Sequence, residues 1–158
     1  MSQDSVTRIL FICMGNICRS PLAEGVFLHH CADRGISEEY EIDSAGIGGW
    51  HAGDQADPRS RAVALRHGIT LVTPSRQVTS RDFETFDLLV AMDEENVRDL
   101  IDLGCPEIKI RSLMQYHPDS THDHVPDPYY GGDEGFDLVY QLVDEASRRF
   151  IDDLQSSS

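Results

Sequence analysis

The residues with the clearest chemical potential lie in one short segment near the N-terminus, Cys13 to Pro21, with the sequence CMGNICRSP. Cys13 supplies a thiol that can act as a nucleophile, and Arg19 supplies a planar guanidinium that matches two oxygens of a phosphate group. A cysteine near an arginine and a helix N-terminus ionises readily, so we expect a thiolate at neutral pH. The Cys-x5-Arg-Ser spacing therefore predicts a phosphate-binding loop.

The elements around this segment suit the same chemistry. An apolar strand ends at Ile12, and a helical pattern begins near Leu22. The first N–H groups of a helix lack intrahelical partners and lie at the positive end of its dipole, so they attract anions. Around the phosphate, we expect the loop residues to contribute further contacts: Met14, Gly15, Asn16, Ile17, Cys18 and Ser20.

Four residues of the loop have types that fit a tight turn before a helix. Gly15 permits a positive φ, and Asn16 tolerates one better than most residues. Ser20 can cap the helix and donate to the thiolate, and Pro21 suits the first helical position. A buried structural cysteine before an ordinary capped helix is the alternative interpretation of the same residues.

Cleavage of a phosphate ester also needs a proton for the leaving oxygen, and Asp127 is the candidate donor. It stands in the sequence Asp127-Pro128-Tyr129-Tyr130, within a long loop. Beside a phosphate dianion and aromatic walls, a carboxyl group tends to stay protonated. An Asp-Pro pair in a loop is also ordinary turn chemistry, so the residues alone leave both interpretations open.

Residues 10–24, LFICMGNICRSPLAE, resemble the signature of the low-molecular-weight protein tyrosine phosphatases, and the resemblance covers nearly the whole chain. The Asp127-Pro128-Tyr129-Tyr130 segment matches the family's general-acid motif. The resemblance implies hydrolysis of protein phosphotyrosine monoesters: Cys13 attacks phosphorus, Arg19 holds the oxygens, and Asp127 protonates the leaving group. A phosphocysteine intermediate is then hydrolysed, with no metal and no cofactor.

The resemblance also implies supporting roles. Ser44 is expected to hydrogen-bond Asn16, and His67 to lie buried and brace the same loop. A histidine at a helix C-terminus, favoured by the dipole, is the alternative for His67. Asp93 could hold an arginine or the loop, although its position is typical of a helix N-cap.

The expected pocket wall comes from aromatic residues. Trp50 lies in the family's variable loop, and with Tyr129 and Tyr130 it could form a deep slot for a phosphorylated ring. A core anchor under a glycine loop is the alternative for Trp50. The resemblance also implies a preference for phosphotyrosine, because relatives that prefer phosphoarginine have a threonine at the position of Ile17. Cys18 is either a reversible disulfide partner of Cys13 or a small residue that fills space.

Composition limits the partners. The chain has 158 residues and a formal net charge of −15, which argues against nucleic acid or an anionic membrane. The polar N-terminus lacks a signal-peptide pattern, and the cysteines do not suggest a disulfide framework, so we expect a cytoplasmic protein. The resemblance implies phosphotyrosine proteins as partners and inorganic phosphate or similar oxyanions in the active site, and we expect a monomer. The histidines and aspartates between His117 and His124 are interpreted as a solvated loop rather than a metal site.

Alternating patterns predict an α/β fold in three layers: a four-stranded parallel sheet, helices on both faces, and the phosphate loop after the first strand. We expect one domain over residues 1–158, with a disordered tail at 155–158. Expected strands are 8–12, 40–44, 87–92 and 107–110, and expected helices are 21–34, 57–67, 79–86, 93–103 and 134–154.

Three rivals remain for this fold class. A phosphoarginine phosphatase would use the same loop. A thiol-linked arsenate reductase would need a further cysteine pair to relay a disulfide, and Cys31 and Cys105 are poorly spaced for that. A non-enzymatic phosphate-binding module would need neither the nucleophile Cys13 nor the acid Asp127, so we consider it the weakest of the three.

Overall fold

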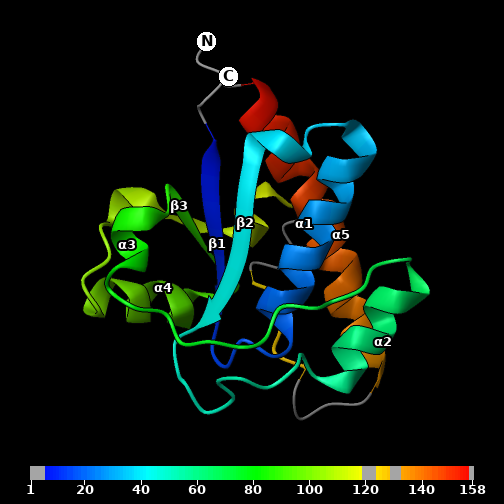
Figure 1. Cartoon of the computed structure of the whole chain (residues 1–158), viewed down its shortest axis with the longest axis horizontal. Helices are drawn as coiled ribbons and strands as arrows, with labels where there is room; N and C mark the ends of the chain where they lie inside the picture. The colour runs from blue at the N-terminus through cyan, green and yellow to red at the C-terminus, as the bar shows by residue number, and fades with distance from the viewer. Residues whose placement is uncertain (1–5, 119–123, 129–132, 157–158) are drawn as a thin grey trace.

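The structure is a computed structural model, and it describes residues 6–118, 124–128 and 133–156. A central parallel sheet separates two helical layers (Figure 1). On one side lie α1 (Arg19–Arg34), α2 (Pro58–Arg66) and α5 (Asp133–Ser156), and on the other lie α3 (Asp82–Thr85) and α4 (Glu94–Asp102). The predicted three-layer α/β fold is confirmed.

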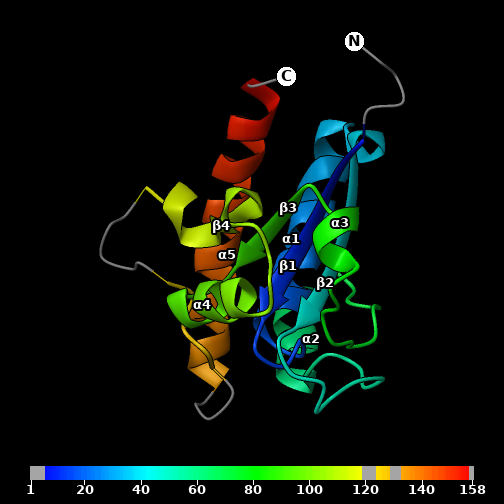
Figure 2. The same cartoon turned by 90° about the vertical axis from the view of Figure 1, so that its left-hand side faces the viewer.

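The sheet has the strand order β2-β1-β3-β4, and every pairing is parallel. The strands are β1 (Thr7–Cys13), β2 (Tyr40–Gly46), β3 (Leu88–Ala91) and β4 (Ile110–Ser112). Because the chain passes from β1 to β2 on one side and reaches β3 on the other, the carboxyl end of β1 is a topological switch point, where α/β sheets bind ligands. The start of β1 and the end of α5 both lie at the end of the molecule opposite to the carboxyl end of β1 (Figure 2).

Alternate residues of β1 build the two cores. Ile9 and Phe11 pack with the helices α1, α2 and α5, where Phe11, Phe27 and Phe150 form a chain of ring contacts. Leu10 and Ile12 face the other way, into the cluster beneath α3 and α4. This alternation follows the two-residue period of a strand, and burial on both faces fixes the register of β1 and the place of its last residue, Cys13.

Most element boundaries lie within two residues of the prediction, but the fourth strand was misplaced. Residues Glu107–Lys109 form a short 3-10 turn, η2, and the strand begins at Ile110, where the prediction ends it. Two further 3-10 turns, η1 (Ser37–Glu39) and η3 (Leu113–Tyr116), occupy expected loops. Helix α5 continues through Ser156, so the expected disordered tail does not begin at residue 155.

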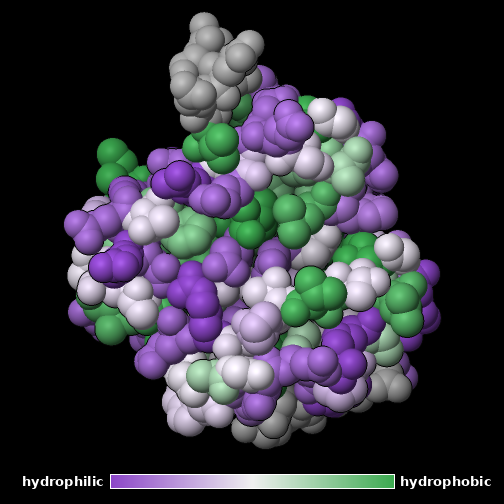
Figure 3. Space-filling view, in the orientation of Figure 1, coloured by the Kyte–Doolittle hydropathy of each residue, from purple (hydrophilic) through white to green (hydrophobic). Residues whose placement is uncertain are grey.

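The face that carries β2 and the segment after α2 is largely covered by hydrophilic side chains, with smaller hydrophobic areas between them (Figure 3). Across residues 6–118, 124–128 and 133–156, no helix is long and apolar enough to cross a membrane. Within the same residues, no group of three or more histidine, cysteine, aspartate or glutamate side chains could hold a metal ion.

Candidate active site

The segment after β1 forms a loop that ends at an uncapped helix. Helix α1 begins at Arg19, and its N-cap residue, Cys18, makes no side-chain capping bond. Ser20, the predicted cap, instead lies inside the helix, and Pro21 occupies a first-turn position where no N–H partner is required. The free N–H groups and the positive end of the dipole therefore remain available for an anion.

The sulfur of Cys13 lies among hydrogen-bond donors. The Asn16 N–H donates to it at 3.3 Å, and the Ser20 hydroxyl lies 3.0 Å away. Asn16 Nδ2 donates to Ser20 Oγ at 2.8 Å, which leaves the hydroxyl hydrogen of Ser20 for the sulfur. Both donors stabilise a thiolate more than a thiol.

Asn16 has the one positive φ, 58°, found at a non-glycine residue in the described part of the chain. Gly15, where the sequence also allowed this conformation, does not adopt it. Two residues distant in sequence hold the turn: the Arg76 N–H donates to Asn16 Oδ1 at 3.0 Å, and Ser75 Oγ donates to the Asn16 carbonyl. Sequence analysis missed this contact, because nothing in the segment around Ser75 indicates it.

A glycine at the end of β2 allows the loop to lie close to the sheet. A Cβ atom on Gly46 would meet Gly15 C and Met14 O at 2.9 Å and Asn16 N at 3.0 Å, all of them backbone atoms that cannot move aside. The backbone of Gly46 is therefore part of the wall that shapes the loop.

Arg19 is 2% exposed, is held by two hydrogen-bond acceptors and has one further carboxylate beside it. Its Nη1 donates to Asp93 Oδ2 at 2.6 Å and to the Val125 carbonyl at 3.0 Å, and its Nη2 lies 3.6 Å from Asp127 Oδ2. Burial alone would lower the pKa of Arg19, but the negative charges of Cys13, Asp93 and Asp127 raise it. Asp93 also caps α4 by accepting from the Asn96 N–H, so both roles considered for it are present.

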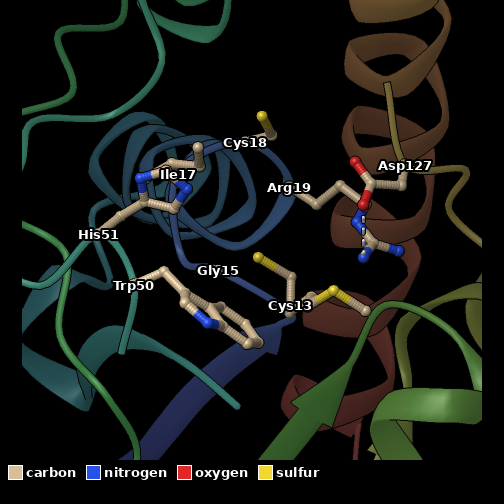
Figure 4. A pocket seen from close by; sticks show the side chains of 9 residues that line it. Cys13, Gly15, Ile17, Cys18, Arg19, Trp50, His51 and Asp127 are labelled. Atoms are coloured by element: carbon tan, nitrogen blue, oxygen red, sulfur yellow. Dashed lines mark ion pairs between the residues drawn. The ribbon is translucent and has the colours of Figure 1, made fainter. Parts of the chain in front are cut away.

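Cys13, Arg19 and Asp127 line one pocket of about 310 Å³ (Figure 4), whereas Asn16 and Ser20, which were expected to contact the phosphate, do not line it. Cys13 lies at its base and Asp127 on one side, beside Arg19, while Trp50 and His51 lie on the opposite side. The Asp127 side chain is 42% exposed, so it can reach both solvent and a bound ligand. A nucleophile, a buried cation and a carboxyl group on one cavity can attack, hold and protonate a phosphate ester.

Comparisons with known proteins agree with this geometry. The family profile of low molecular weight phosphotyrosine protein phosphatases matches residues 8–158. The chain belongs to this family. A low molecular weight protein-tyrosine-phosphatase of Streptomyces coelicolor is 45% identical over 145 residues, which cover 89% of this chain and 88% of that protein.

Solved structures show the same family fold. An Entamoeba histolytica protein tyrosine phosphatase, with Hepes in its active site, has a TM-score of 0.92 and 39% identity, and the match covers 96% of this chain and 98% of that chain. A Drosophila arginine phosphatase has a TM-score of 0.89 and 30% identity, with 95% of this chain and 99% of that chain covered. The predicted family and enzyme class are confirmed.

Seen as a phosphatase pocket, the aromatic wall is only partly described. Trp50 is 73% exposed and lines the pocket, so the alternative of a core anchor is wrong. Tyr129 and Tyr130 lie outside the described residues. His51, which the sequence analysis missed, lines the pocket next to Trp50 and lies 3.5 Å from Asp54.

Two further residues that line the pocket, Ile17 and Met14, have apolar side chains. Ile17 is nearly buried, and its carbonyl accepts from the Asp57 N–H at 2.7 Å. Met14 is more exposed, and its carbonyl accepts from the Gly48 N–H at 2.9 Å. These two bonds tie the phosphate loop to the segment after β2 and to the N-terminus of α2.

The cysteines differ in their environments. Burial raises the pKa of the Cys18 thiol, and the charges of Asp57 and Cys13 raise it further, so Cys18 is a neutral thiol at physiological pH. Its sulfur points away from that of Cys13 (Figure 4), and a disulfide between them stays a prediction. Cys31 and Cys105 are buried in the two separate cores, away from the pocket, which opposes the arsenate reductase relay.

Two predicted supporting residues have other contacts. Ser44 Oγ donates to Glu24 Oε1 at 2.6 Å rather than to Asn16, and Thr73 donates to the other oxygen of Glu24 at 2.7 Å. Burial raises the pKa of Glu24, while these two hydrogen bonds oppose the rise. The pair of hydroxyls joins α1, β2 and the segment that ends at Ser75.

His67 does not brace the loop. It is the exposed C-cap residue of α2, and its ring stacks on Tyr140 with centroids 3.8 Å apart and planes at 10°. The helix C-terminal alternative is therefore the correct one, because α2 ends there and Gly68 turns the chain with a φ of 79°.

Proposed function

We propose that this phosphatase hydrolyses phosphotyrosine monoesters in proteins, with Cys13 as nucleophile, Arg19 as the phosphate-binding cation and Asp127 as general acid. The observation that supports it most is the meeting of these three side chains on one cavity at the uncapped N-terminus of α1. Phosphotyrosine proteins are the proposed substrates, and inorganic phosphate or a similar oxyanion the proposed product-site ligand.

In the first step the Cys13 sulfur attacks phosphorus, an S–P bond forms and the ester P–O bond breaks. Asp127 gives its proton to the departing phenolate oxygen. Arg19 and the N–H groups of the loop hold the other phosphoryl oxygens, where negative charge accumulates in the transition state. In the second step water attacks the phosphocysteine, Asp127 takes a proton from that water, and the S–P bond breaks to release phosphate.

The partners of the three groups support this division of labour. The Asn16 N–H and the Ser20 hydroxyl stabilise Cys13 as a leaving thiolate in the second step. Asp93 and the Val125 carbonyl hold one edge of the Arg19 guanidinium, which leaves its remaining donors for phosphate oxygens. The cation is thus oriented before substrate binds.

The walls of the pocket favour an aromatic ester. Ile17 and Trp50 present apolar surface beside the phosphate loop, and a pocket of about 310 Å³ suits a phenyl ring with its phosphate. Phosphoserine has no ring that could contact this apolar wall. Phosphoarginine is the second candidate substrate, because a Drosophila arginine phosphatase shares this fold.

We further propose that the protein acts as a monomer in a reducing cytoplasm. The four cysteines, all present as free thiols, suit such a compartment.

The direct test compares turnover of phosphotyrosine, phosphoserine, phosphoarginine, and arsenate with thioredoxin. We expect phosphotyrosine to give the highest kcat/KM. Asp127→Asn should lower kcat/KM, which reports the first step alone, about 10²- to 10⁴-fold on phenyl phosphate, and much less on p-nitrophenyl phosphate, whose leaving group needs no proton. Asp152→Asn, at an exposed carboxylate that pairs with Arg34 on the outer surface, is the matched control. Equal losses on both esters would show that Asp127 is not the acid.

A further inference from the structure

The indole of Trp50 lies directly against the backbone of Gly48. A Cβ atom built on Gly48 would overlap Cζ3, Cε3 and Cη2 of Trp50, so the ring occupies the space that any other side chain would fill. Trp50 is 73% exposed, and its ring forms a wall of the pocket opposite Asp127 (Figure 4). The position of the indole therefore depends on the absence of a Cβ atom at residue 48.

The backbone of Gly48 is in turn fixed to the phosphate loop. The Gly48 N–H donates to the Met14 carbonyl at 2.9 Å, and the neighbouring Ile47 N–H donates to the Cys13 carbonyl at 2.9 Å. These two bonds hold Gly48 at a constant distance from the nucleophile. The indole rests on a platform that is itself attached to the base of the pocket.

We propose that Gly48 is a specificity-determining residue, which positions the Trp50 indole so that it packs on the aromatic ring of a substrate whose phosphate sits over Cys13. This inference rests on the proposed function and names the part of the pocket that selects aryl esters. A ring one ester bond away from phosphorus meets the indole, whereas a small phosphate without a ring gains nothing from it.

The matched pair Gly48→Ala and Gly49→Ala tests this proposal. Both add one methyl group to adjacent loop residues. At Gly49 the new Cβ would approach Gln77 Oε1 at 2.8 Å, which is the movable end of an exposed side chain, so Gly49→Ala should leave the indole in place. Because Trp50 is the only tryptophan of the chain, intrinsic fluorescence reports on its ring alone.

Binding is measured by calorimetry with phenylphosphonate, an aryl ligand that cannot be hydrolysed, and with inorganic phosphate. Since an aromatic contact contributes up to about tenfold in affinity, we expect Gly48→Ala to raise the Kd of phenylphosphonate about two- to tenfold. The Kd of inorganic phosphate should stay within about twofold, which shows that the phosphate loop is intact. Tryptophan emission should change in Gly48→Ala and stay unchanged in Gly49→Ala.

Kinetics supply the second readout. With phosphotyrosine, Gly48→Ala should raise KM by the same factor at constant kcat, because the indole contacts the ring in the ground state and the transition state alike. With acetyl phosphate, which has no ring, neither parameter should change. In a Trp50→Ala background, adding Gly48→Ala should have no further effect on phenylphosphonate binding.

Equal phenylphosphonate affinity in the two glycine variants would overturn the proposal, and so would an effect of Gly48→Ala that persists without Trp50. Parallel losses of phenylphosphonate and phosphate binding would also overturn it, since they would place the effect in the loop. These binding results need no turnover. If the wild-type protein failed to hydrolyse phosphotyrosine, the proposed function would fail while the role of Gly48 in aryl binding would still be decided.

Discussion

Replacement of Asn16 by alanine tests how the phosphate loop is held in shape. The substitution removes two hydrogen bonds, a buried one to Ser20 Oγ at 2.8 Å and a partly buried one from the Arg76 N–H at 3.0 Å. It also forces an alanine to adopt a φ of 58°. Because the Ser20 hydroxyl then loses the donor that orients it toward Cys13, we expect kcat to fall along with stability.

The loss of stability follows from these contacts. Each hydrogen bond contributes about 1 kcal/mol net, and an alanine in the left-handed region costs about 1 kcal/mol more. The sum is about 3 kcal/mol, which for a chain of this length lowers Tm by about 6–12 °C. A domain with about 5–15 kcal/mol of stability remains folded, so the kinetics of the variant stay measurable.

Asn16→Gly is the matched control. Glycine loses the same two hydrogen bonds but adopts the positive φ without strain, so its free energy of unfolding should exceed that of Asn16→Ala by about 0.5–1 kcal/mol. Urea unfolding and the kcat for phosphotyrosine are measured on all three proteins. If Asn16→Ala were as stable as the wild type, or more stable than Asn16→Gly, the account of the loop would be refuted.

Substitutions at three further residues probe the surroundings of the site. Burial raises the pKa of Glu24, so its contribution to stability is complete below the ordinary glutamate pKa of about 4.3 and is lost as pH rises through the raised pKa. In urea unfolding, the wild type should therefore lose stability relative to Glu24→Gln as pH rises above about 4.3, and a gain would contradict this. Asp93→Asn keeps the cap of α4 but removes the negative charge that pairs with Arg19, so kcat should fall and stability should drop by about 1–2 kcal/mol. Asp93→Ala also removes the cap and should lose about 1 kcal/mol more, so equal stability of the two variants would argue against the cap. His67→Ala should leave kcat within about twofold and lose about 0.5–1.5 kcal/mol from the Tyr140 stack, whereas a large fall in kcat would restore a bracing role.

Local patterns predicted the fold and the strand, loop and helix that carry Cys13 and Arg19, whereas Asp127 was indicated by the resemblance to the family, because an Asp-Pro pair in a loop alone leaves its role open. The apolar run before Cys13 forms a strand buried on both faces, and the glycine, arginine and proline around it lead from that strand into a helix. The fourth strand was misplaced because its short apolar stretch also fits a 3-10 turn, and pairing with β3 decides where it begins.

Contacts between distant segments could not be predicted in the same way. The support of Asn16 by Ser75 and Arg76, and of Glu24 by Thr73, depends on how the segment after α2 lies against the loop and α1. The support of Glu24 by Ser44 depends on how β2 lies against α1. A serine or threonine in an extended segment gives no indication of its partner. The resemblance to the family suggested a partner for Ser44 and a role for His67 that this chain does not have, since both side chains are engaged elsewhere.

The close approach of glycines is a second feature that sequence alone does not reveal. Gly46 lies against the backbone of the phosphate loop, and Gly48 lies beneath the indole of Trp50. A run of small residues before a tryptophan indicates a loop, but the space that each missing side chain leaves becomes visible only once the two segments meet.

The central claim is that phosphate is transferred to the sulfur of Cys13. Asp127→Asn, which lacks the base for the second step, is mixed with p-nitrophenyl phosphate, quenched in acid within the first turnover and digested for mass spectrometry. We predict the mass of one phosphoryl group on the peptide that contains Cys13, and none in Cys13→Ser. A phosphoryl group on another residue, or a burst of nitrophenol with no phosphorylated peptide under conditions where a phosphocysteine standard survives, would contradict the account.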